Sequence, residues 1–139
     1  MKKAQTAVFA LMLIFAIAQA YKFMVSRAAR AACSAYQPGT VFSAVDFVNY
    51  VIEHDSRDAA ITDLSQAVPD PRDISNQVKT VPLVARNFKK QEFLPAAFAQ
   101  IDQQGLAGKA VLVSKVGFGT YTCNISFEKG KVISSLGSW

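Results

Sequence analysis

The sequence has few of the side chains from which catalytic and metal sites are built. It contains one histidine and two cysteines in 139 residues, and the cysteines lie far apart, at Cys33 and Cys123. This spacing excludes a CxxC redox motif, and these three residues cannot supply the usual four ligands of a zinc site. The sequence also has no phosphate-binding glycine loop and no nucleophile-elbow motif. We therefore expect no enzymatic activity, no cofactor and no bound metal.

Residues 4–21 carry no charge, and neither glycine nor proline occurs before Pro38. The uncharged segment follows Lys2 and Lys3 and is centred on an apolar run at residues 8–18. A membrane-spanning helix needs about 17–25 mostly apolar residues, whereas a signal peptide has an apolar run of about 7–15 residues behind a basic start. The segment therefore predicts a transmembrane helix or a signal peptide, with a buried helix as the third alternative.

The choice between anchor and signal peptide depends on a cleavage pattern and on helix breakers. Ala18-Gln19-Ala20 has the small residues of a signal-peptide cleavage site. However, the sequence from Thr6 to Ala35 is rich in alanine and has no breaker, which predicts one helix about 45 Å long. We favour the anchor. Residues 1–35 are then a membrane-anchor helix with an amphipathic extension, and residues 36–139 form one extracytoplasmic domain, which is secreted if cleavage occurs.

The orientation follows from the flanking charges and the cysteines. Lys22, Arg27 and Arg30 balance the basic residues at the N-terminus, so the positive-inside rule alone does not decide it. The short, signal-like N-terminal tail favours export of the C-terminal part. In an oxidising compartment Cys33 and Cys123 are a candidate disulfide, the alternative being two separate buried thiols. We expect a single-pass protein of a bacterial inner membrane with its domain in the periplasm.

Charge is unevenly distributed along the chain. Residues 1–45 have five basic and no acidic side chains, residues 46–73 have seven acidic and two basic, and residues 74–139 have eight basic and three acidic. This pattern predicts a dipolar domain whose basic half can face acidic lipid or a protein partner.

The pattern after residue 36 predicts an α+β domain, with helices packed on a small three-stranded antiparallel sheet. Ser43 and Asp46 fit a capping box at the start of a helix that ends near Asp55. Residues 59–68 are ambiguous and are compatible with a short helix. Further helices are expected behind Pro71 and at residues 84–93 and 95–104, and strands at residues 110–116, 120–127 and 131–135.

Two segments offer weak candidate binding sites. The histidine lies in an acidic cluster that could share a metal or ligand, formed by Glu53, His54, Asp55 and Asp58. Because adjacent residues do not face each other on a helix, a solvated helix end is the favoured interpretation. Residues 86–93 mix basic and aromatic side chains, but we interpret them as core aromatics with solvated lysines between them. Nucleic acid is therefore not an expected partner.

The apolar segment itself offers a contact for another helix. Ala16 and Ala20 are four residues apart and share one helical face, as close packing of membrane helices requires. The expected partners are therefore membrane lipid and other membrane-protein subunits. These observations favour a non-enzymatic accessory or assembly subunit of a bacterial envelope complex, anchored by a single helix.

In outline, a long apolar N-terminal helix before a small domain with an antiparallel sheet resembles the type IV pilins and pseudopilins. Their processing motif, a glycine before a phenylalanine with a glutamate soon after, is missing here: Phe9 follows Val8, and the first acidic residue is Asp46. The resemblance therefore covers shape and not chemistry. Two alternatives remain, a pilin-like subunit that polymerises through its N-terminal helix and an exported ligand-binding sensor or enzyme.

Overall fold

The computed structural model describes residues 2–54, 58–66, 81–83, 94–116 and 119–139. Its helices and strands follow one another along the chain as α1 (Lys2–Val25), α2 (Arg27–Ala35), α3 (Ala44–Glu53), β1 (Asp58–Thr62), β2 (Val81–Leu83), α5 (Leu94–Gln104), β3 (Gly108–Val116), β4 (Gly119–Glu128) and β5 (Lys131–Ser138). The helices expected behind Pro71 and at residues 84–93 lie outside the described residues.

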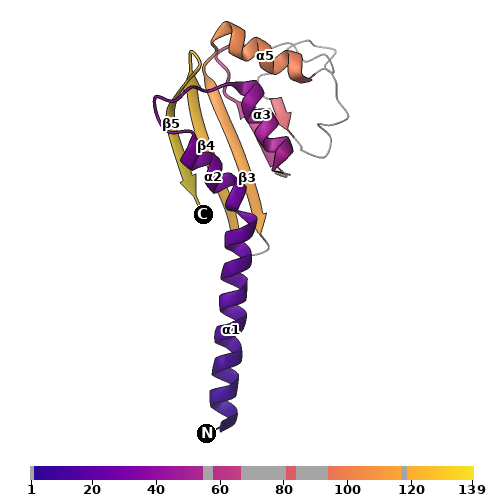
Figure 1. The fold of residues 1–139 in the computed structure, drawn as a ribbon, viewed down its shortest axis with the longest axis vertical. Coiled ribbons are helices and arrows are strands. Elements are labelled where there is room, and N and C mark those ends of the chain that lie inside the picture. Colours follow the sequence, from indigo (N-terminus) through magenta and orange to yellow (C-terminus); the bar gives the residue numbers. More distant parts are fainter. Residues whose placement is uncertain (1, 55–57, 67–80, 84–93, 117–118) are drawn as a thin grey trace.

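Helix α1 projects away from the rest of the protein, which is gathered around its C-terminal end (Figure 1). Its segment Lys3–Val25 has a mean hydropathy of 2.0, and none of it is buried. Within the described residues, α1 is the one helix that is long and apolar enough to cross a membrane or to serve as a signal sequence. The sequence-based prediction of such a helix is confirmed.

Helices α1 and α2 are separated by the single residue Ser26, which is fully buried. Backbone hydrogen bonds cross this junction, from the Ser26 N–H to the Lys22 carbonyl (3.2 Å) and from the Arg30 N–H to the Ser26 carbonyl (3.0 Å). The Ser26 hydroxyl also donates to the Phe23 carbonyl at 3.2 Å. The unbroken helix expected from Thr6 to Ala35 is therefore interrupted at one position, and the two helices remain joined by hydrogen bonds of helical spacing.

The described sheet has five antiparallel strands in the order β2-β1-β3-β4-β5. Strands β3, β4 and β5 form the antiparallel meander that the sequence predicts, and β1 and β2 extend it at the free edge of β3. Residues 59–68, which the sequence leaves ambiguous and compatible with a short helix, are not helical in their first part, because residues 58–62 are strand. Ala59 and Ile61 alternate into the core at the two-residue period of a strand, and Ile61 pairs with Ala110 of β3.

The hydrophobic core lies between the sheet and the helices α2, α3 and α5. Strand β4 contributes alternate residues to it, as its sequence predicts, and its members 121, 123, 125 and 127 are all buried. Phe42, in the connection before α3, stacks on Phe127 of β4 with ring centroids 4.1 Å apart. Phe47 of α3 and Phe98 of α5 are fully buried among these groups. This packing fixes the positions of α2 and α3, whose ends define the candidate site.

Cys33 of α2 and Cys123 of β4 form a pair at disulfide distance, with Cα atoms 5.7 Å apart. Cys123 is fully buried on the core side of the sheet. A disulfide here ties the helix that continues from α1 to the second strand of the meander. It joins positions 90 residues apart in sequence.

Candidate functional site at the junction of α1, α2 and α3

Helix α3 is held at its N-terminus by two capping groups. The Ser43 hydroxyl accepts a hydrogen bond from the Asp46 N–H at 3.2 Å, as the capping-box pattern predicts. Asp102 of α5 supplies a second cap: its carboxylate accepts from the Ala44 N–H (2.6 Å), from the Val45 N–H (3.2 Å) and from the Ser43 hydroxyl (2.8 Å). A carboxylate at this end of a helix also complements the helix dipole. The cap orients α3 so that its other end approaches α2.

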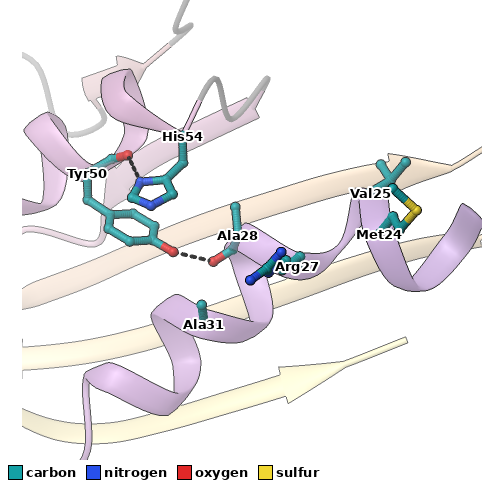
Figure 2. A pocket seen from close by; sticks show the side chains of 7 residues that line it. All are labelled: Met24, Val25, Arg27, Ala28, Ala31, Tyr50 and His54. Carbon is teal, nitrogen blue, oxygen red and sulfur yellow. Dashed lines mark hydrogen bonds between the residues drawn. The ribbon is translucent and has the colours of Figure 1, made fainter.

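At its C-terminal end, α3 is joined to the start of α2 by Tyr50. The Tyr50 hydroxyl donates a hydrogen bond of 2.7 Å to the carbonyl of Ala28 (Figure 2). A tyrosine phenol is protonated at neutral pH, and burial raises the pKa of Tyr50 further, so its hydroxyl is available as a hydrogen-bond donor. This bond connects the domain to the first turn beyond the apolar helix.

His54 follows α3 as its C-terminal capping residue and packs on Tyr50. The two rings are stacked, with centroids 4.0 Å apart, and Nδ1 of His54 lies 2.9 Å from the backbone carbonyl oxygen of Tyr50. Because a carbonyl oxygen only accepts, Nδ1 carries the hydrogen in this contact, and Nε2 is left for another partner. The stacked pair forms one wall of a hollow beside α1 and α2.

This hollow is a pocket of about 510 Å³. It is lined by residues from the end of α1, the start of α2 and the end of α3, namely Met24, Val25, Arg27, Ala28, Ala31, Tyr50 and His54 (Figure 2). Its volume is within the usual range of small-ligand pockets, about 300–1,000 Å³. Arg27 is the cation of the pocket. Its side chain is exposed, and among the described residues it has no hydrogen-bond or ion-pair partner.

The opposite side of the same helix end carries an aromatic and basic cluster. The Lys22 ammonium lies over the ring of Trp139, 4.0 Å from its centroid. Trp139 in turn contacts Tyr121 of β4 edge-to-face, with centroids 5.2 Å apart. Tryptophan and tyrosine are enriched where proteins meet the headgroup layer of a membrane. The end of α1 is therefore flanked by the Arg27 pocket on one side and by this cluster on the other.

The predicted acidic site around the histidine is only partly described. Glu53 and His54 are exposed at the end of α3, Asp58 begins β1, and Asp55 lies outside the described residues. In the part of the chain that the structure describes, no three His, Cys, Asp or Glu side chains lie close enough to hold a metal ion together. His54 instead lines the pocket at the junction. Ligand binding by the acidic residues stays a prediction.

The predicted helix contact and the basic segment have different outcomes. Ala16 and Ala20 both lie on α1, where the side chains of these two residues are exposed, as a contact with another helix requires. The contact itself stays a prediction. Residues 86–93, interpreted as core aromatics with solvated lysines, lie outside the described residues.

The sequence did not predict that Arg27 and Tyr50 line a common pocket, or that Tyr50 joins α3 to α2. One signal for the pair Tyr50 and His54 was present, because residues four apart on a helix are neighbours on its surface. Arg27 gave no comparable signal, since the approach of α3 to α2 depends on contacts between distant parts of the chain. The chain matches no known protein family, no curated protein and no solved structure.

Proposed function

We propose that this protein is a non-enzymatic accessory or assembly subunit of a bacterial envelope complex, held in the inner membrane by α1 with its domain in the periplasm. The observation that carries the proposal is the exposure of α1. The helix is apolar, and none of Lys3–Val25 is buried against the domain. Apolar surface of this extent is stable only when lipid or another protein covers it. A membrane containing a partner subunit provides both.

Retention of α1 in the mature protein is supported by its regular helix. The helix runs through Ala18-Gln19-Ala20 without a break, whereas proteolysis prefers exposed, irregular backbone. It also continues through the Ser26 junction into α2, whose residues Ala29 and Ala32 are fully buried in the core. We expect the intact mass of protein isolated from native membranes to include residues 1–20. A mass corresponding to a chain that begins at Tyr21 would make the protein a secreted domain and refute the anchor.

The contact with a partner is proposed to use the face of α1 that carries Ala16 and Ala20. Small side chains at this spacing let two helices approach closely in lipid, where van der Waals packing drives association. Replacing both by isoleucine increases hydrophobicity, so insertion into the membrane is maintained while close approach is blocked. We expect the Ala16→Ile/Ala20→Ile variant to lose its partner during purification in mild detergent.

The matched control is Ala18→Ile, which makes the same substitution on the opposite side of the helix, about 200° from Ala16 at 100° per residue. This control should co-purify like the unaltered protein. If the double variant keeps its partner and removal of residues 36–139 abolishes the interaction, recognition lies in the domain and α1 is only a tether. If no membrane protein co-purifies with the unaltered chain from native membranes, the accessory role is wrong.

A pilin-like role is the second candidate, because one observation favours it. The exposed apolar helix α1 continues into α2, and α2 lies against the sheet, so one N-terminal helical unit serves both as a protruding rod and as part of the domain (Figure 1). Such a unit is suited to helix–helix packing in a polymer. Electron microscopy of material sheared from cells tests it: fibres containing this chain would favour polymerisation, and discrete detergent-solubilised complexes would favour the accessory role.

A further inference from the structure

We propose that the pocket at the junction of α1, α2 and α3 binds the headgroup of a membrane phospholipid, with Arg27 holding its phosphate. This inference rests on the proposed insertion of α1 into a membrane, and it adds a lipid ligand that the accessory role does not require.

The pocket lies at the depth of the phosphate groups. At about 1.5 Å per residue, the segment from Lys3 to Lys22 spans about 29 Å, close to the hydrocarbon thickness of about 30 Å. When this segment fills the hydrocarbon, Arg27 lies about 7.5 Å beyond its end. The headgroup layer extends roughly 5–8 Å on each side of the hydrocarbon. The Arg27 guanidinium is therefore placed where the lipid phosphates lie.

Arg27 has the chemistry and the freedom to bind a phosphate. A guanidinium offers paired N–H donors that match two oxygens of a phosphate, and such charge-assisted hydrogen bonds are stronger than neutral ones. The neighbouring basic residues are already engaged by protein groups. The Lys22 ammonium lies over Trp139, and Arg30 lies over the Phe23 ring while donating to the Phe23 carbonyl at 3.3 Å. Arg27 is the basic residue of this junction that has no such partner among the described residues.

The other walls of the pocket suit the remainder of a lipid. Met24 and Val25 come from the last turn of α1, which faces the membrane, and they provide an apolar wall for the glycerol and upper acyl region. Tyr50 and His54 close the side farther from the bilayer with their stacked rings (Figure 2). The pocket is thus apolar toward the membrane and polar toward the domain. This order of polarity matches a phospholipid that stands in the same leaflet beside α1.

The test uses the full chain in detergent micelles, titrated with phosphatidylglycerol and observed by native mass spectrometry. We expect one lipid to bind in preference to further ones, and Arg27→Gln to weaken its binding about tenfold or more, as loss of a charge-assisted contact implies. Ala31→Phe fills the pocket without changing the charge and should weaken binding similarly. Lys22→Gln removes the same charge about one and a half turns away, on the side of the helix that faces Trp139, and should change binding by less than about twofold. Circular dichroism checks that each variant is folded.

Several outcomes would overturn the inference. Equal effects of Lys22→Gln and Arg27→Gln would show a diffuse basic belt in place of a site. Unchanged binding in both Arg27→Gln and Ala31→Phe would show that the pocket is not used. If glycerol phosphate binds with the same affinity as phosphatidylglycerol and displaces it at millimolar concentration, the pocket is a site for free phosphate compounds and not for a lipid. Carbonate extraction of native membranes separates this inference from the proposed function, because it tests membrane insertion alone. If the chain stays in the membrane but its lipid binding does not depend on Arg27, the lipid site is refuted and the proposed anchor is not.

Discussion

The Ser43 hydroxyl donates a hydrogen bond of 2.8 Å to the carboxylate of Asp102, a residue 59 positions away in the sequence. The same carboxylate accepts from two backbone N–H groups in the first turn of α3. One side chain of α5 therefore satisfies donors that every α-helix leaves free at its N-terminus. Through this contact α5 determines where α3 lies, and α3 in turn carries Tyr50 and His54 to the junction with α2.

Replacing Asp102 by alanine should lower the free energy of unfolding by about 2–3 kcal/mol, because part-buried N–H groups then lose their partner. Chemical denaturation of the full chain in detergent, followed by circular dichroism, measures the change. Asp46→Ala is the matched control. It removes a carboxylate that belongs to the first turn of α3 itself, but this side chain is exposed, and its loss should cost only about 0.3–1 kcal/mol. Equal losses in the two variants would show that the dipole and not the hydrogen bonding matters.

The pair Cys33 and Cys123 is expected to form a disulfide in the native protein. The double variant Cys33→Ala/Cys123→Ala should then have a free energy of unfolding lower by about 2–5 kcal/mol. Reductant should destabilise the unaltered chain by a similar amount and leave the double variant unchanged, which serves as the control. Quantitative alkylation of both thiols in protein prepared without reductant would contradict the prediction and place the domain in a reducing compartment.

The hydrogen bond between Tyr50 and Ala28 is expected to stabilise the union of α3 with α2. Tyr50→Phe keeps the ring stacked on His54 and removes only the hydroxyl, which donates at 2.7 Å. We expect a loss of about 0.5–1.5 kcal/mol in the free energy of unfolding. Hydrogen exchange should locate the effect, with faster exchange in the last turn of α3 and little change in β3–β5. Uniformly faster exchange across the sheet would contradict a local role.

Stability should fall in alkaline solution because of Tyr36. Burial raises the pKa of the Tyr36 phenol, and the charge of Asp46 and the nearby Tyr50 raise it further. A group whose folded pKa lies above its unfolded value of about 10 contributes its full stabilisation below that pH, and this contribution is lost as the pH rises through the folded pKa. The free energy of unfolding should therefore decrease above about pH 10. Tyr36→Phe should flatten this dependence, and an unchanged slope in the variant would refute the assignment.

Local sequence signals predicted the elements that depend on local chemistry. Ser43 marked the start of α3, and alternation of apolar residues marked β4. Helix α5 ends before Gly105, whose φ of +59° favours glycine. The apolar run likewise marked α1. Each of these features is determined by residues that lie close together in the sequence. The local sequence pattern is therefore sufficient to predict it.

The missed features depend on pairs of distant residues. The sequence of strand β1 does not alternate clearly between apolar and polar residues, because Ala60 lies between Ala59 and Ile61, and its pairing with β3 decides its conformation. The cap of α3 by Asp102 gives no sign in the sequence around either residue. The pocket at the junction depends on two sets of contacts between distant residues. Its walls meet only after α5 has positioned α3 and the sheet has positioned α2. It could not be predicted from the order of residues along the chain.

The helical hydrogen bonding across Ser26 has a consequence for orientation. Because α1 and α2 are joined without a flexible linker, the rotational position of the domain about the axis of α1 is coupled to the face that α1 presents to its surroundings. Each residue of an α-helix turns the chain by about 100° and advances it by about 1.5 Å. One alanine inserted between Val25 and Ser26 would therefore turn the whole sheet about the axis of α1 by more than a quarter of a circle while shifting it along that axis by only about 1.5 Å. A partner that contacts both α1 and the domain would therefore bind only when the two have this one relative orientation.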